Sequence, residues 1–164
     1  MQEMQNNKIV IIDIDGVLFD PTERLERCKE EGGIINWARA FSNEEVYQDP
    51  VIKGAPEAIQ QINSRFRIIY LTGRSNNCVD ATTERMREEG FVKERIITRP
   101  SGDFTPDDKL KRESIEKLRF LYDYDFVAVI DDNYNGKLKP MYEALGIPCF
   151  LTFQDFFQSD IWKK

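Results

Sequence analysis

The pattern of apolar and polar positions predicts strands that alternate with helices along most of the chain. Residues 8–14 (KIVIIDI) are apolar and largely β-branched on both faces, which is typical of a buried central strand in a parallel sheet. Helices are expected between the strands because the intervening segments are longer and amphipathic. The alternation predicts an α/β fold, a Rossmann-like three-layer αβα sandwich with a parallel sheet. The further strands are expected at 66–71, 96–98, 126–130 and 149–152, and the helices at 55–64, 78–89, 106–121 and 139–145.

Residues 21–50 interrupt this alternation. They indicate two or three short charged helices, broken by Gly32-Gly33 and by Ser42. An excursion of this length between the first strand and its crossover helix resembles a small lid over the sheet edge. We therefore expect one domain over residues 1–164, with a small helical cap insert at about 20–52.

The C-terminal segment is rich in aromatic residues. Their spacing suits one terminal amphipathic helix docked on the core, so packing is the expected role. The residues concerned are Phe153, Phe156, Phe157, Ile161 and Trp162.

Composition narrows the chemistry. The chain has no histidine, which excludes imidazole-based zinc sites and Ser-His or Cys-His catalysis, so reactivity must depend on carboxylates, Lys, Arg or Thr. Three cysteines without metal-ligand spacing indicate reduced thiols and a cytoplasmic location. No apolar run approaches the roughly 20 residues that span a bilayer, so no membrane partner is expected. The net charge of −6 weakens attraction to nucleic acid without removing it.

Two carboxylates follow the first strand. Asp13 and Asp15 are two residues apart, so an extended backbone would point both to the same side, and Gly16 comes next. Carboxylates so close repel each other unless a cation intervenes. Oxygen ligands at the carboxyl end of a strand suit Mg²⁺, although the pair could also be strand-capping acids in a turn.

A second acidic pair ends another strand, in FVAVIDDN. Asp131 and Asp132 follow an apolar run of the same kind, so two strand ends each deliver two carboxylates. One pair could be a turn led by Asp132 and Asn133, whereas two pairs indicate a metal site. We expect Asp13, Asp15, Asp131 and Asp132 to surround Mg²⁺.

Candidate phosphate-binding groups follow a third strand, in IIYLTGR. The Thr72 hydroxyl could bind a phosphate oxygen, or it could cap the next helix. Gly73 and Arg74 are expected to bind substrate, although the Arg74 side chain could instead lie in solvent.

A positively charged side chain should neutralise part of the negative charge of the phosphate and the nucleophile. Lys111 shares a helical face with Ile115 and Leu118 and should point inward. Lys109 is the reserve candidate, because it shares a solvated face with Arg112. Lys111 is therefore the expected active-site lysine.

These residues, in this order, resemble the haloacid dehalogenase (HAD) superfamily of phosphohydrolases. The resemblance rests on Asp13-Ile14-Asp15-Gly16, Thr72-Gly73-Arg74, Lys111 and Asp131-Asp132. Receiver domains use a similar set in a different order. The resemblance implies that Asp13 attacks phosphorus and forms an aspartyl-phosphate, while Asp15 acts as acid and then base. It also implies that Mg²⁺ is held by Asp13, the Asp15 carbonyl, Asp131 and Asp132, with Thr72 and Lys111 completing the neutralisation of the phosphoryl group.

A narrower resemblance lies in ITRPSGDFTPDDKLKRESI. Arg99, Gly102-Asp103 and Asp107, upstream of Lys111, are similar to the phosphatase half of phage-type polynucleotide kinases, which removes 3′-phosphates from nucleic acid ends. Arg99 could bind substrate, or with Asp103 it could hold the loop. No Walker loop is present, so no partner kinase is expected; separately, no obligate protein partner is expected.

Three functions remain open. The favoured one is a phosphatase for nucleic acid 3′ ends; the second is a nucleotidase or small-metabolite phosphatase, which the acidic balance favours. Trp37 and Phe41 could stack on a base, or they could be packing within the lid. The third is a phosphate-binding module without turnover.

Overall fold

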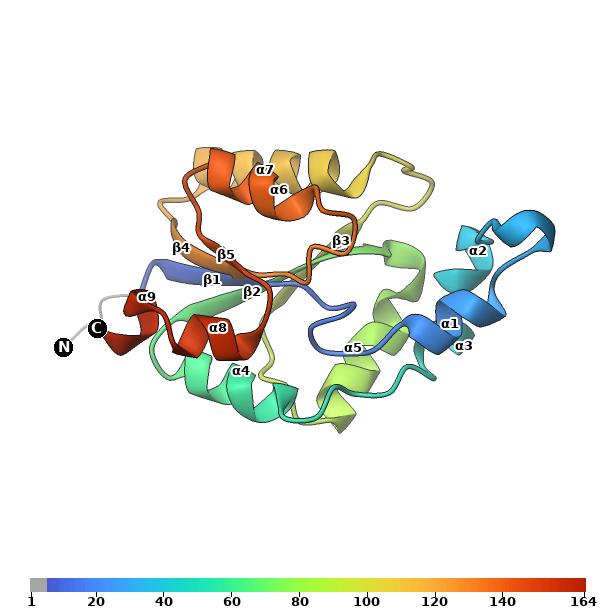
Figure 1. Ribbon diagram of the computed structural model, residues 1–164, viewed down its shortest axis with the longest axis horizontal. Helices are drawn as coiled ribbons and strands as arrows, with labels where there is room; N and C mark the ends of the chain where they lie inside the picture. Colours follow the sequence, from blue (N-terminus) through green and yellow to red (C-terminus); the bar gives the residue numbers. More distant parts are fainter. Residues whose placement is uncertain (1–5) are drawn as a thin grey trace.

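A five-stranded, wholly parallel sheet forms the centre of the computed structural model, which describes residues 6–164 (Figure 1). The strand order is β3-β2-β1-β4-β5, so β1 lies in the middle between β2 and β4. This architecture confirms the α/β class expected from the sequence. The strands are β1 (Lys8–Ile12), β2 (Arg67–Ser75), β3 (Arg95–Arg99), β4 (Asp125–Ile130) and β5 (Cys149–Phe150).

Helices cover both faces of this sheet (Figure 1). Alternate residues of β1 supply both cores: Ile9 and Ile11 pack toward α6 and α7, while Val10 and Ile12 pack toward α4 and α5. All four side chains are fully buried, which explains the unbroken apolar run in the sequence. The helices are α4 (Ala55–Asn63), α5 (Val79–Glu88), α6 (Asp107–Leu121) and α7 (Leu138–Ala144), with a short 3-10 turn, η2 (Asn76–Cys78), before α5.

Four short helical segments lie between β1 and α4, and Figure 1 shows them beyond the carboxyl ends of the strands. The side chains of Asn36 and Ser42 cap two of them by accepting the backbone N–H groups of Arg39 and Glu45. The group, called here the cap, packs beside α5, where Asn43 accepts the N–H of Ala81. Its members are α1 (Thr22–Arg27), η1 (Glu31–Gly33), α2 (Trp37–Ala40) and α3 (Asn43–Val46).

The ends of several elements differ from those expected. β1 stops at Ile12, and β2 continues to Ser75, so Thr72 lies inside a strand instead of beyond its end. Thr72 does not cap the following helix, because Ser75 takes that role through the N–H of Asn77.

The C-terminal segment also differs from its prediction. It forms two short helices, α8 (Phe153–Phe157) and α9 (Asp160–Lys163), instead of one. The break brings the Trp162 ring to within 4.9 Å of the Phe157 ring centre and 5.9 Å of that of the buried Phe156. In residues 6–164, no helix is long and apolar enough to cross a membrane.

Candidate active site

The ends of β1 and β4 bring two carboxylates together. The two strands are paired up to Ile12 and Ile130, and the Asp13 N–H continues the pairing with the Ile130 carbonyl at 3.0 Å. Asp13 and Asp131 therefore leave adjacent strands at the same level, and both are buried. Residues 118 positions apart in the chain become neighbours for this reason alone.

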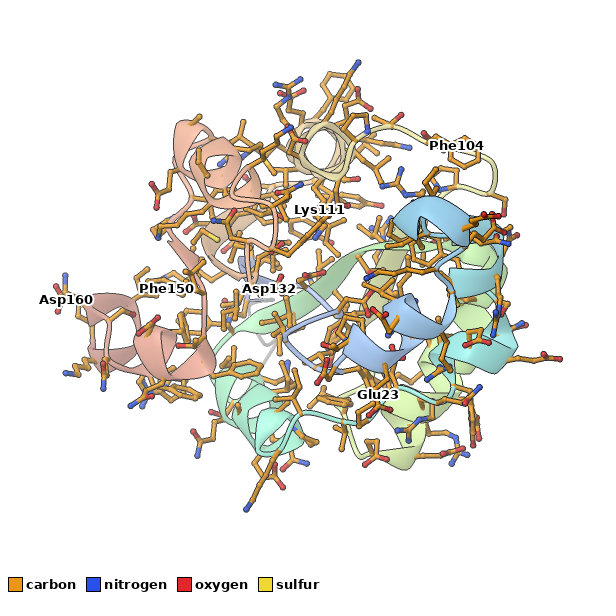
Figure 2. All side chains as sticks on the ribbon, turned by 45° about the vertical axis from the view of Figure 1, so that its right-hand side comes forward. Glu23, Phe104, Lys111, Asp132, Phe150 and Asp160 are labelled. Carbon is orange, nitrogen blue, oxygen red and sulfur yellow. The ribbon has the colours of Figure 1, made fainter. Side chains whose placement is uncertain are left out.

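Lys111 reaches this pair from the buried face of α6. Its Nζ lies 3.1 Å from Asp13 Oδ1 and 3.0 Å from Asp131 Oδ2. Figure 2 shows Lys111 and Asp132 at the centre of the molecule, between the helix and the strand ends. The side chain is only 1% exposed, and Ile115 and Leu118 on the same face are also buried. Lys109, the reserve candidate, is exposed on the opposite side of the helix.

Burial dominates the electrostatics of this group. It raises the pKa of Asp13 well above its usual value, and the charge of Lys111 offsets only part of that effect. Burial, followed by the charge of Asp131, raises the pKa of Asp132 to about 6. The Lys111 pKa is raised well above its usual value because the charges of Asp13 and Asp131 outweigh the desolvation of the ammonium group. One ammonium group thus faces an excess of carboxylates.

The donor set fits a hard divalent cation. Asp13, Asp131 and Asp132 each offer a carboxylate oxygen, and these oxygens lie within 4.8 Å of one another. Asp132 Oδ1 is buried without a hydrogen-bond partner in residues 6–164, so it has an unmet need for a cation or donor. Carboxylate oxygens are the ligands that Mg²⁺ prefers, and the excess negative charge favours it further.

Gly16 allows Asp132 to enter this group. Its φ is +82°, and a Cβ placed there would lie 2.0 Å from Asp132 Oδ2. Asn133, also at positive φ, binds Asp131 through its backbone N–H and accepts the N–H groups of Leu138 and Lys139. The turn after β4 is therefore fixed by the start of α7.

Asp15 lies outside the three-carboxylate group and is bound by two arginines. Its Oδ1 accepts N–H groups of Arg74 at 2.7 and 3.0 Å and one of Arg24 at 3.0 Å. Burial raises the Asp15 pKa, but these guanidinium charges outweigh it and hold the pKa below its usual value. No hydrogen bond within residues 6–164 involves Oδ2, and the side chain is 28% exposed toward the cavity. One oxygen is thus fixed while the other is accessible.

Asp49 completes the arginine network. It accepts Arg24 Nε at 3.1 Å and Arg74 Nη2 at 2.9 Å, and all three side chains are 1% exposed. Arg24 also donates to the Ala40 carbonyl and so links α1, α2 and the sheet. Sequence reasoning missed Arg24 and Asp49, because they stand among many charged residues of the cap and no spacing distinguishes them. Arg74, expected to bind substrate or lie in solvent, is buried in this network and so does not lie in solvent.

Gly73 lines the cavity, and Thr72 is buried directly before it in β2. Thr72 is 1% exposed, and its Oγ1 accepts the backbone N–H of Arg74 at 3.0 Å. A Cβ on Gly73 would lie 2.4 Å from Asp107 Oδ1, so only glycine admits this carboxylate. Asp107 Oδ2 in turn lies 3.6 Å from Lys111 Nζ. Asp107 therefore joins the loop after β3 to the lysine.

Arg99 holds the loop of residues 100–106. It donates to the backbone carbonyls of Gly73, Asp103 and Thr105 at 3.0, 3.1 and 2.5 Å. The Asp103 side chain accepts both the N–H and the hydroxyl of Thr105. Of the two roles considered for Arg99, the contacts match the structural one.

These groups surround a cavity of about 510 Å³, a size common for small-molecule sites. Asp13, Asp15 and Asp132 face it from the strand ends, the cap forms one wall and the loop of residues 100–106 forms another. An anionic substrate in this cavity would lie beside Asp13 and Asp132, two of the three carboxylates that could hold a cation.

The family model of the polynucleotide kinase PNKP phosphatase domain matches residues 7–157. A search of curated protein sequences finds no match.

Several solved structures share the fold. A chain of the Pnkp1/Rnl/Hen1 RNA repair complex superposes with a TM-score of 0.65 at 21% identity, over 92% of this chain and 43% of that chain. A haloacid dehalogenase-like hydrolase of Streptococcus pneumoniae gives 0.62 at 10% identity, over 89% and 84%. The class C acid phosphatase of Bacillus anthracis with tungstate bound gives 0.55 at 18% identity, over 98% and 77%. The chain spans less than half the length of the repair-complex chain that it matches.

Proposed function

The chain belongs to the family of polynucleotide kinase PNKP phosphatase domains, within the haloacid dehalogenase superfamily, and we propose that it is a Mg²⁺-dependent phosphohydrolase that removes 3′-phosphates from nucleic acid ends. The observation that carries this proposal is the position of Lys111 Nζ between Asp13 and Asp131, with Asp132 and Asp15 beside them at one cavity. Phosphoryl transfer depends mainly on positioning and on charge neutralisation, which this group supplies.

In the first step Asp13 is the nucleophile. One of its carboxylate oxygens attacks phosphorus in line, and the bond between phosphorus and the leaving oxygen breaks as the aspartyl-phosphate forms. The leaving alkoxide takes a proton from Asp15, whose Oδ2 is the accessible oxygen. The alcohol product then leaves.

In the second step water attacks the aspartyl-phosphate. Asp15, now ionised, accepts the proton of the attacking water, and the bond between phosphorus and Asp13 breaks. Inorganic phosphate is released, and both carboxyl groups return to their starting states. Arg24 and Arg74 favour the ionised form of Asp15 that this step requires.

The carboxylates of Asp13, Asp131 and Asp132, together with the Asp15 carbonyl, would hold Mg²⁺, which neutralises the phosphoryl oxygens when bound. Lys111 adds a fixed positive charge, and we assign the Thr72 hydroxyl and the Gly73 backbone N–H as donors to a phosphoryl oxygen. We assign Arg74 to the orientation of Asp15, because its guanidinium group is already paired. Arg99 is assigned to the shape of the binding wall.

Phosphorylated substrates are the expected partners. The second candidate function is a nucleotidase or small-metabolite phosphatase. The acidic lining of the cavity favours small substrates of this kind over long polyanions. The acidic residues are Asp13, Asp15, Asp103, Asp107 and Asp132. Cys28, Cys78 and Cys149 are free and buried, which agrees with the expected cytoplasmic location.

Phosphate release tests the proposal. A 3′-phosphorylated oligonucleotide, a 5′-phosphorylated one, nucleoside monophosphates and sugar phosphates are compared with Mg²⁺ and with excess chelator. We expect Mg²⁺-dependent release with 3′-phosphates preferred. Equal rates on 5′-phosphates or sugar phosphates would favour the second candidate. Phosphate binding without release from any substrate would identify a binding module instead.

A further inference from the structure

Four aromatic side chains line the cavity, and two of them, Trp37 and Phe104, stand on different walls. Trp37 comes from α2 in the cap, and Phe104 comes from the loop of residues 100–106. Figure 2 shows Phe104 at the end of this loop, beside the cap helices. Both are incompletely covered by protein, with 44% of Trp37 and 84% of Phe104 exposed. Large apolar side chains held beside a polar centre are typical of ligand sites.

Trp37 is supported from behind. Its ring centre lies 5.2 Å from that of Phe41, and the rings are inclined by 31°. Phe41 packs in turn against the buried cluster of Val46, Cys78 and Ala81. Trp37 is therefore held on one side by the cap core while its remaining surface faces the cavity. Packing within the lid was the alternative to base stacking for Trp37 and Phe41. It explains the position of Phe41 better than that of Trp37, which is 44% exposed.

The backbone at Phe104 is held in place by hydrogen bonds of the residues on either side of it. The carbonyls of Asp103 and Thr105, on either side of it, both accept N–H groups of Arg99. Asp103 also bonds Thr105 through its side chain. The backbone is thus fixed, and the ring is presented to solvent and cavity without a packing role that explains it. Because the backbone is already fixed, a flat ligand that stacks on the ring has only the Phe104 side chain left to order.

The charges around the cavity limit what can bind beside the phosphate. Arg99 is its only basic residue among residues 6–164; Nε and Nη1 of its guanidinium group donate to three backbone carbonyls, and Nη2 lies 3.7 Å from Asp107 Oδ1. Five acidic residues line the same space. A phosphodiester chain would meet no row of cations here, whereas a neutral base would meet aromatic surfaces and the polar side chains of Ser75 and Asn77.

We propose that Trp37 and Phe104 stack against the base of the terminal nucleotide, so that the protein reads one nucleoside beside the phosphate and no further part of a strand. This inference rests on the proposed phosphatase function and names its substrate class. Stacking is tolerant of base identity, because every base has an aromatic face. A nucleoside 3′-monophosphate and a 3′-phosphorylated strand should therefore be handled alike.

The test compares adenosine 3′-monophosphate with glycerol phosphate, which has no base, in Trp37→Ala, Trp37→Phe and Phe104→Ala. Phe120→Ala is the matched control, because Phe120 is 89% exposed but lies on α6 outside the cavity. We expect kcat/KM for the nucleotide to fall about tenfold in the two alanine variants at Trp37 and Phe104, as loss of one stacking contact predicts. Glycerol phosphate turnover should not change in them, and Trp37→Phe should retain most of the nucleotide preference. An equal fall for both substrates, or no fall for either, would overturn the inference.

A second experiment varies the length of the nucleic acid substrate and the salt concentration. Mononucleotide and a short 3′-phosphorylated oligonucleotide should have kcat/KM values within about threefold of each other between about 50 and 200 mM salt. A large advantage of the oligonucleotide that declines with salt would show contacts along the strand and refute the limit to one nucleoside.

A binding measurement separates this inference from the catalytic proposal. If the protein releases phosphate from no substrate, the phosphatase proposal fails, and the fluorescence of Trp37 then decides the inference. The other tryptophan, Trp162, packs on Phe156 and does not line the cavity. Quenching by adenosine 3′-monophosphate but not by glycerol phosphate, weakened in Phe104→Ala, supports stacking. Absence of quenching contradicts it.

Discussion

Asp13 and Asp15 are two residues apart, yet the regions around them differ in almost every physical respect. Asp13 is 5% exposed among other carboxylates and one lysine, and burial raises its pKa well above the usual value. Asp15 is opposed by two arginines, which lower its pKa despite burial. Because β1 ends at Ile12, the chain turns between the two side chains and sends them to different partners.

The difference separates two roles within one short motif. The Asp13 region gathers negative charge from β1 and β4 and so has an affinity for a cation. The Asp15 region gathers positive charge from the cap and β2 and fixes one carboxylate oxygen. In the proposed mechanism, the first region suits a nucleophile beside a metal, and the arginines favour the ionised Asp15 that accepts a proton in the second step.

The largest expected effect comes from replacing each aspartate in turn. Asp13→Asn should lower p-nitrophenyl phosphate hydrolysis by about a thousandfold or more, because the nucleophile is lost. Asp15→Asn should still release p-nitrophenolate, a leaving group that needs no proton, in a burst equal to the enzyme concentration, and then stall. Rapid-mixing absorbance measures both. A burst in Asp13→Asn would disprove covalent attack by this residue.

Breaking the arginine network should mainly affect stability. Arg74→Met leaves Asp49 and Asp15 with Arg24 alone, and loss of one partner in a buried ion pair costs about 3–5 kcal/mol. The free energy of unfolding, measured in urea, should fall by that amount. Arg74→Met combined with Asp49→Asn should recover part of it, and a purely additive loss would show that the two side chains act independently.

Magnesium should stabilise the protein by binding the carboxylates around Asp13 and not the side chain of Asp15. At one hundred times its Kd a ligand contributes about 2.7 kcal/mol, which raises the melting temperature by roughly 5–10 °C in a chain of this size. Differential scanning calorimetry should detect this shift in the wild-type protein and in Asp15→Asn, which keeps the backbone carbonyl. Asp131→Asn should lose most of it. An undiminished shift in Asp131→Asn would place the ion elsewhere.

The smallest effect is expected for Lys109→Ala. Lys109 is exposed, and surface substitutions usually change stability by less than about 0.5 kcal/mol. Phosphate release should remain near the wild-type rate, whereas Lys111→Met should abolish it by leaving Asp13 and Asp131 without their cation. A severe loss in Lys109→Ala would reverse the choice between the two lysines.

The fold class and the family were both predictable from the chain. Apolar strands alternating with amphipathic helices identify the parallel sheet, and the structure and the comparisons confirm it, together with the resemblance to the haloacid dehalogenase superfamily. Element ends were less predictable. β2 extends through Thr72 to Ser75 because Ser75 pairs with Arg99 of β3, a contact that no local pattern in either strand reveals.

The site residues remain a prediction, although the structure brings several of them together. Strand ends followed by acids could be read locally, as could the inward side of Lys111, because both depend on short periodic patterns. Arg24 and Asp49 could not, since their partners lie 9 to 25 residues or more away in sequence and on different elements. The ion pairs of Arg74 with Asp15 and Asp49 were unpredictable for the same reason.

By itself, the sequence determined that a parallel sheet would bring strand ends to one edge, and it predicted the residues that carry the chemistry. These are local properties, fixed by side-chain type and by the period of burial. Only the tertiary structure decided which charge meets which, and hence that Asp13 faces carboxylates while Asp15 faces arginines. Electrostatic energy depends on distances and on burial, and both are set by elements that the chain order keeps far apart.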